Sequence, residues 1–462
     1  MPMNPETHAQ PTLMEELKAS TLACHARLQE APFFQALATS QLPSESYVGQ
    51  LRALSVIHGA LEHEIESSPD EAVASVWDSG MRKLPALQKD LRYFEPRAVA
   101  DIKESVEEAL HIAGDIRLRS LRQPLALLGY VYVLEGSMLG ARVLRPQFAR
   151  AFQLEGNEGL SYLNHYGADV DAHWSQYRQR MDALQLGPDG REQVVQAACL
   201  FFTQIKFVFD ALYPFKPESK AYLAVSINPE AGRHPVPADM REIQASVKAA
   251  DSCWQRFPYF ESRYGERGQR FAKSDGAWLA TLCQFDQPRM DQQVRWLGRV
   301  LAARGMPTLL LQAHLEILAD ELAAAVPEKK PLYEKLQIAA LVLREWRGQQ
   351  IDDGYLQILD DEFHRAVGPN WNGRIEHAGL LLAAAVADEM NGNVGAINGV
   401  KHWMTDASRF HAEWIAAAED TITKAQAYAR LRAGQGGQGL EMPQMPVIPA
   451  GMTGFFGASS LG

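Results

Sequence analysis

Residues 125–145, LALLGYVYVLEGSMLGARVLR, constrain the fold of this chain more than any other stretch. They contain no proline and their apolar residues recur at helical spacing, which predicts a helix. Yet this helix would contain three glycines, Gly129, Gly136 and Gly140, and each costs about 1 kcal/mol relative to alanine. Because Gly136 and Gly140 are four residues apart, they lie on one face and leave a groove without side chains. Something must approach that backbone closely.

Three structures would account for the groove. Another helix could pack there, as it often does on pairs of small residues. The helix could bend, since glycine beside Ser137 often marks a kink. A large planar ligand could also lie against the backbone. The choice depends on whether the chain supplies a second wall for such a ligand.

Helical patterns dominate the rest of the chain and predict an all-α fold. They cover residues 12–215 and 240–432, and no segment alternates in the way a strand would. Five prolines within a short polar region predict a linker over residues 216–239. We expect residues 1–11 and 433–462 to be disordered. The chain of 462 residues is long enough for two such domains.

Composition excludes several broad classes of protein. The net charge of −11 and the lack of a dense Lys/Arg run argue against nucleic-acid binding. No stretch reaches the length expected of a membrane span, and the polar N-terminus has no apolar signal core. Four cysteines lie far apart, without zinc spacing, as expected in a reducing compartment: Cys24, Cys199, Cys253 and Cys283. We therefore expect a cytoplasmic protein.

A literal dinucleotide motif occurs near the C-terminus. Residues 434–439 spell GQGGQG, which matches GxGxxG. The motif binds a dinucleotide only between a strand and a helix, and neither is predicted there. We interpret it as flexible chain.

His25 is the first candidate for chemistry. It lies in a predicted helix beside Cys24, and a histidine there is more often a core or surface residue than a ligand. A neutral imidazole on a helix is, however, one way in which proteins hold haem iron. The opposite wall must then be close backbone, and Gly136 and Gly140 could supply it.

Three segments resemble a known family when taken together. ELKASTLACHARLQEAPFFQAL, SYVGQLRALSVIHGALEHEIE and GYVYVLEGSMLGARVL are similar to biliverdin-producing haem oxygenases, above all to the bacterial, phytochrome-associated type. The resemblance covers about residues 12–215. It implies a haem-oxygenase-like helical domain, followed here by a second helical domain of unknown role.

The resemblance also implies roles for single residues. His25 would be the proximal iron ligand, and Lys18 would pair with a haem propionate. Gly136 and Gly140 would be the distal-helix glycines over the haem face. Ser137 stands where animal enzymes have an aspartate that organises distal water, so the proton-delivery network would differ here.

The implied reaction converts haem, O2 and electrons into biliverdin, CO and ferrous iron. Haem would be both substrate and cofactor. The sequence shows no nucleotide or flavin fold. Electrons would therefore come from a separate reductase or ferredoxin, and ultimately from NAD(P)H.

Two other functions fit parts of the sequence. A non-catalytic haem sensor or carrier could use His25 without turnover. A haem-oxygenase-like di-iron oxidase could use His58, Glu62, His63 and Glu66, because carboxylates and histidines on facing helices hold such sites. We expect those four residues instead to form a polar, partly exposed helix face.

The second domain offers fewer candidates. His314 lies in an apolar helix and is expected to be a core histidine. His364 and His377 lie near Trp371 and could line a second ligand site. This domain could dimerise, dock an electron donor or sense a ligand.

Overall fold

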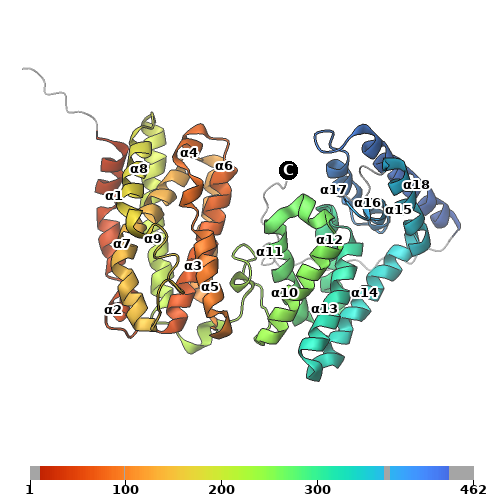
Figure 1. The fold of residues 1–462 in the computed structure, drawn as a ribbon, viewed down its shortest axis with the longest axis horizontal. Coiled ribbons are helices and arrows are strands. Elements are labelled where there is room, and N and C mark those ends of the chain that lie inside the picture. The colour runs from red at the N-terminus through yellow and green to blue at the C-terminus, as the bar shows by residue number, and fades with distance from the viewer. Residues whose placement is uncertain (1–10, 98, 369–374, 436–462) are drawn as a thin grey trace, which may run out of the picture. The chain divides into compact units, whose positions relative to one another are not determined.

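The computed structural model describes residues 11–97, 99–368 and 375–435 (Figure 1). The chain divides into two compact units, with the boundary between Arg233 and His234. The predicted all-α fold is confirmed, since the described residues contain only two strands of two residues each. Residues 1–10 and 436–462, where disorder was predicted, lie outside the described residues, as does Trp371.

Nine α-helices form the first unit within its described residues. They are α1 (Leu13–Gln29), α2 (Pro32–Ala38), α3 (Ser44–Glu66), α4 (Glu71–Val76), α5 (Leu84–Phe94), α6 (Lys103–Arg122), α7 (Ala126–Phe152), α8 (Val170–Asp182) and α9 (Pro188–Leu212). Short 3₁₀ turns connect some of them: η1 (Ser79–Met81), η2 (Glu95–Arg97), η3 (Gly167–Asp169), η4 (Pro217–Ser219) and η5 (Ala224–Ser226).

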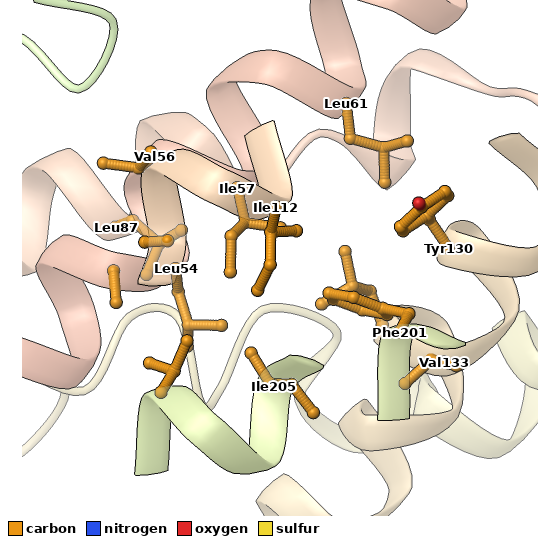
Figure 2. Packing of buried hydrophobic residues seen from close by; sticks show 14 of the residues in the cluster. Leu54, Val56, Ile57, Leu61, Leu87, Ile112, Tyr130, Val133, Phe201 and Ile205 are labelled. Atoms are coloured by element: carbon orange, nitrogen blue, oxygen red, sulfur yellow. The ribbon is translucent and has the colours of Figure 1, made fainter. Parts of the chain in front are cut away.

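Most residues of α3 are buried, because α5, α6 and α9 all pack against it. Figure 2 shows this packing from close by: Leu54, Ile57 and Leu61 of α3 lie near apolar side chains of α6, α7 and α9. Local sequence defines the ends of the helices. Thr12 and Glu15 form a capping box at α1, and Pro188 opens α9.

The segment predicted to be a linker packs onto the first unit instead. Strand β2 (Lys220–Ala221) pairs antiparallel with β1 (Asp101–Ile102). The backbone N–H of Leu223 donates to Asp101 Oδ2 at 2.9 Å, and Leu223 and Val225 are buried in the core. Proline content predicted the irregular backbone correctly. It did not show that the apolar residues between the prolines are buried.

The second unit also consists of α-helices in its described residues. They are α10 (Met240–Arg256), α11 (Tyr259–Leu282), α12 (Gln287–Ala303), α13 (Thr308–Ala325), α14 (Lys330–Gln350), α15 (Asp353–Val367), α16 (Ala378–Met390), α17 (Ala396–Met404) and α18 (Ala412–Gln435), with one 3₁₀ turn, η6 (Pro327–Lys329). Helix α11 is broken at Gly265, whose φ of 52° is left-handed and strains any residue with a side chain.

Two helices correct the expectation about membrane spans. By length and composition, α7 and α9 are apolar enough to cross a membrane, with mean hydropathies of 1.3 and 1.4 over their most apolar windows. Both pack against each other in the first unit. Their composition matches the burial of one face of each helix in the core.

Candidate functional site

Two contacts determine how α1 and α7 run relative to each other. The hydroxyl of Thr21 lies 3.5 Å from that of Tyr132. Farther along both segments, the ring centroid of Phe33 in α2 lies 6.5 Å from that of Phe148. Because the contacts follow the same order in both segments, α1 and α7 run in the same direction.

His25 and Gly136 each lie about one turn beyond the contact between Thr21 and Tyr132. Each follows its contacting residue by four positions, about one helical turn of 5.4 Å. A planar ligand between the two helices would need the imidazole and the glycine on facing sides, and this remains a prediction.

The side chain of His25 is accessible. The residue is exposed, and its ring meets Phe202 of α9 edge-on, with centroids 5.8 Å apart. Within the described part of the chain, no hydrogen bond or ion pair occupies its ring nitrogens. An exposed imidazole without a protein partner can accept a metal ion of a bound ligand.

The three glycines of α7 have different surroundings. A Cβ on Gly129 would lie 2.3 Å from the carbonyl oxygen of Val194, so α9 packs tightly there. A Cβ on Gly136 would lie 3.6 Å from Trp174, and one on Gly140 would meet nothing within 4 Å. Helix α7 continues through all three positions. Helix packing thus explains Gly129, the helix is not interrupted at the glycines, and the face at Gly140 stays open.

Apolar surface borders this open face. Leu22 and Val143 are each 65% exposed. Leu22 precedes His25 by three residues and Val143 follows Gly140 by three, so each lies on the same helix face as its neighbour. Exposed apolar side chains that gather beside a groove are typical of a ligand-binding surface.

Lys18 lies on the same face of α1, seven residues before His25. It is exposed, and it makes no ion pair with any described residue. Its ammonium group is therefore available to an anion at the edge of the groove.

A buried ion pair holds α7 at Glu135, the residue before Gly136. Lys83 Nζ lies 2.7 Å from Glu135 Oε1 and donates to Tyr166 at 2.8 Å and to the Met81 carbonyl at 2.9 Å. Tyr166 in turn donates to Glu135 Oε2 at 2.8 Å. Burial lowers the pKa of Lys83, while the Glu135 charge and hydrogen bond act in the opposite direction.

Sequence spacing does not identify this network. Glu135 is an acid in an apolar helix, and its partner lies 52 residues away in the sequence. The network holds the residue just before Gly136. It is therefore a positioning device for the groove backbone.

Ser137 turns toward its own helix. Its hydroxyl donates to the Leu134 carbonyl at 2.7 Å. Burial raises the pKa of the nearby Tyr162, and Ser137 lowers it in part. Ser137 thus supplies a hydroxyl group between the two groove glycines in the sequence.

The di-iron candidates have other roles. Glu62 Oε1 accepts from the backbone N–H of Lys83 at 2.7 Å and of Leu84 at 3.1 Å, at the start of α5. His58 Nδ1 lies 3.1 Å from the same oxygen. Glu66 pairs with Arg82 at 2.5 Å. Among the described residues, no group of three or more His, Cys, Asp and Glu could hold a metal ion.

The expectation of a partly exposed face is therefore wrong for two of these residues. His58 and Glu62 are buried, because Glu62 caps a neighbouring helix across the core. His63 is half-buried.

The candidate ligand site at His364 and His377 is organised by Asp360. His364 Nε2 lies 3.5 Å and His377 Nδ1 3.2 Å from this carboxylate, which also accepts from the Leu380 backbone N–H at 2.9 Å. Asp360 thus anchors the start of α16. The prediction that His314 is a core histidine is confirmed, since it is buried in α13.

Comparison with known proteins identifies the family that the first unit resembles. The heme oxygenase family model matches residues 11–211. Heme oxygenase 1 of Gallus gallus is 29% identical over 230 residues, covering 47% of this chain and 75% of that protein. Heme oxygenase 2 of Macaca fascicularis is 25% identical, covering 43% of this chain and 65% of its own length.

Solved structures cover a similar share of the chain. Heme oxygenase from Leptospira interrogans has a TM-score of 0.40 at 21% identity, covering 43% of this chain and 99% of that one. Heme oxygenase-1 from Synechocystis, in complex with heme, has a TM-score of 0.41 at 18% identity, covering 44% and 93%.

The first unit is thus an enzyme domain. Residues 11–211 form a haem oxygenase family domain. The match ends before the second unit begins at His234.

Proposed function

We propose that the first unit is a haem oxygenase that converts haem, O2 and electrons into biliverdin, CO and ferrous iron. One observation supports the proposal most directly. The contact between Thr21 and Tyr132 lies one turn before His25 on α1 and one turn before Gly136 on α7, and the face at Gly140 is open. The family match over residues 11–211 supports the same function.

His25 serves as the iron ligand. A neutral imidazole leaves the iron able to activate oxygen without the strong electron donation of a thiolate, and the porphyrin itself supplies the redox chemistry. Phe202, edge-on to the ring, restricts how the imidazole can turn. Lys18 pairs with a propionate at the edge of the groove.

Gly136 and Gly140 let backbone lie against the ligand face. A side chain at either position would occupy that volume. Ser137, between them in the sequence, supplies a hydroxyl group. This group orders water that delivers protons in place of a distal carboxylic acid.

The finer assignment follows from the EGS sequence at residues 135–137. We infer a bacterial, phytochrome-associated type of haem oxygenase that acts in the cytoplasm. Electrons reach it from a separate reductase or ferredoxin that uses NAD(P)H.

The first experiment tests His25. The full chain is titrated with haem and then given ascorbate in air; we expect the Soret band to fall while biliverdin absorbance rises. His25→Ala should weaken haem binding and lower turnover roughly 100-fold or more, because the iron loses its ligand. His111→Ala, at an exposed histidine of α6, is the matched control.

The other outcomes would favour a different function or exclude His25 as the iron ligand. A stable haem spectrum under reducing conditions would indicate a haem sensor or carrier. Bound non-haem iron without haem affinity would favour the di-iron alternative. Unchanged binding and turnover in His25→Ala would exclude this residue as the ligand.

A second experiment tests the groove. Gly140→Leu should abolish turnover by filling the open face while the domain stays folded. Gly114→Leu is the control, because a Cβ on this exposed glycine of α6 also meets nothing within 4 Å. Equal turnover in the two variants would show that the groove does not hold the substrate.

A further inference from the structure

Helix α8 packs against both α1 and α7, the two helices of the proposed groove. At the end of α8, Asp182 Oδ1 accepts from the backbone N–H of Met14, at the start of α1, at 3.0 Å. Nearer the start of α8, the ring of His173 stacks on that of Tyr166, with centroids 4.2 Å apart. Tyr166 in turn donates to Glu135 of α7 at 2.8 Å. Helix α8 is therefore fixed to α1 at one end and to α7 at the other.

Trp174 is the residue of α8 that meets the glycine face of α7. A Cβ on Gly136 would lie 3.6 Å from Cη2 and 3.8 Å from Cζ3 of this tryptophan, which belong to its six-membered ring. One turn earlier on α7, the ring centroid of Tyr132 lies 6.2 Å from that of Trp174. The outer edge of the indole thus covers α7 at both positions.

The glycine face of α7 is covered at Gly136 and open at Gly140. A Cβ on Gly140 would meet nothing within 4 Å, although it lies only about one turn farther along the helix. Tyr132, on the covered side, contacts α1 as well as α8, because its hydroxyl lies 3.5 Å from that of Thr21. Thr21, Tyr132 and Trp174 therefore close one end of the groove.

The indole of Trp174 is held in place from two sides. The residue is half-buried, and its ring stacks on that of Tyr177, with centroids 5.5 Å apart and 29° between the planes. Tyr177 is buried, so this support cannot swing into solvent. His173, the residue before Trp174, is stacked on Tyr166. A side chain supported in this way forms a fixed wall against a ligand.

We propose that Trp174 is a specificity-determining residue, whose indole forms the end wall of the groove and fixes how haem is turned in the plane of its ring. This role rests on the proposed function. A planar ligand on the open face at Gly140 meets the edge of the indole before it reaches Tyr132. Haem has several bridging carbons that can be cleaved, so a single biliverdin isomer forms only if the macrocycle is held in one orientation.

The test compares the full wild-type chain with Trp174→Ala and Trp174→Phe. Haem is turned over with ascorbate in air, and the biliverdin isomers are separated by chromatography. We expect one main isomer from wild type. Trp174→Ala should change the isomer ratio roughly tenfold or more, because a missing contact in a pocket wall changes discrimination by at least that factor. Trp174→Phe keeps one aromatic ring and should change the ratio less.

A second measurement does not depend on turnover. Proton NMR of the ferric haem complex separates the haem methyl resonances according to the orientation of the macrocycle. Trp174→Ala should add a set of resonances that wild type lacks. Haem titration followed at the Soret band should show a smaller loss of affinity in Trp174→Ala than in His25→Ala, because the iron ligand is kept.

Trp296→Ala is the matched control. This tryptophan is also half-buried, but it lies on α12 in the second unit. Its replacement should change neither the isomer ratio nor the haem resonances. Circular dichroism shows which variants fold. If Trp174→Ala does not fold, Trp174→Phe provides the same test with a smaller expected change.

The outcomes separate this inference from the proposed function. Folded Trp174 variants that give the isomer ratio and the haem resonances of wild type would overturn Trp174 as the wall, while wild-type turnover would still support a haem oxygenase. Haem that binds without turnover, yet changes its orientation in Trp174→Ala, would overturn the proposed function and support the wall. A wild-type chain that binds no haem would overturn both.

Discussion

The two units contain buried titratable groups with different partners. The first unit pairs its buried Lys83 with Glu135 and satisfies its buried Asp90 and Asp101 with backbone N–H groups, while His25 stays exposed. The second unit buries His314 and half-buries Asp275 beside a cavity of about 460 Å³, and burial displaces the pKa of each. A satisfied buried pair supports a backbone, whereas a buried group that the chain leaves unsatisfied indicates a place for a ligand.

The largest expected effect is on the buried pair. Lys83→Ala should lower the free energy of unfolding of the first unit by about 3–5 kcal/mol, because Glu135 stays buried without a cation. Chemical denaturation followed by circular dichroism measures it. Lys89→Ala, at an exposed lysine of the same helix, should change stability little.

A double variant sharpens this result. Lys83→Met combined with Glu135→Leu removes both charges, so much of the stability should return. If haem turnover stays low in this stable protein, the pair also positions the groove. A double variant as unstable as Lys83→Ala would show that the charges were not the cause.

The next effect concerns His314 and pH. Burial lowers the pKa of His314 to about 4, below its usual value of about 6.5. Between pH 6.5 and 4, His314 therefore binds a proton in the unfolded chain but not in the folded chain. This histidine should remove ~3 kcal/mol of stability across that range as pH falls.

The measurement compares the second unit's unfolding in wild type and His314→Leu. Asp275 is common to both proteins, so its own titration largely cancels in the difference. The free energy of unfolding of wild type, relative to that of His314→Leu, should fall by ~3 kcal/mol between pH 7 and 4. A difference that stays constant with pH would mean that His314 titrates normally and is not buried without a partner.

The smallest effect compares two glycines of one helix. Gly129→Ala should destabilise the first unit by about 1–3 kcal/mol, because its Cβ would collide with the carbonyl of Val194. Gly140→Ala should stabilise it by up to about 1 kcal/mol, since alanine favours the helix and meets nothing. Thermal unfolding measures both variants. If both changed the melting temperature in the same direction, the contrast between a packed Gly129 and an open Gly140 would be wrong.

The sequence predicted much of the candidate site. Periodicity was sufficient for an all-α fold, because helical spacing of apolar residues reflects local geometry. The resemblance selected His25, Gly136 and Gly140, and the structure shows His25 exposed and the face at Gly140 open. Spacing alone could not tell that Gly129 packs on α9 while Gly140 stays open.

Other features needed contacts between distant parts of the chain. Lys83 lies 52 residues from Glu135, and nothing near either residue predicts their pairing. Helical spacing predicted that Glu62 belongs to a polar face, whereas its carboxylate accepts backbone hydrogen bonds at the start of α5. The cavity of the second unit joins five helices between residues 250 and 402, so no single stretch predicts it.

By itself, the sequence determined the helices, their caps and the residue types that a haem site needs, because these depend on neighbours within a few positions. Only the tertiary structure decided which glycine stays open, which acid is paired and where the second unit is hollow. These depend on the side chains that other helices bring to the same place, and burial then sets their charge and accessibility.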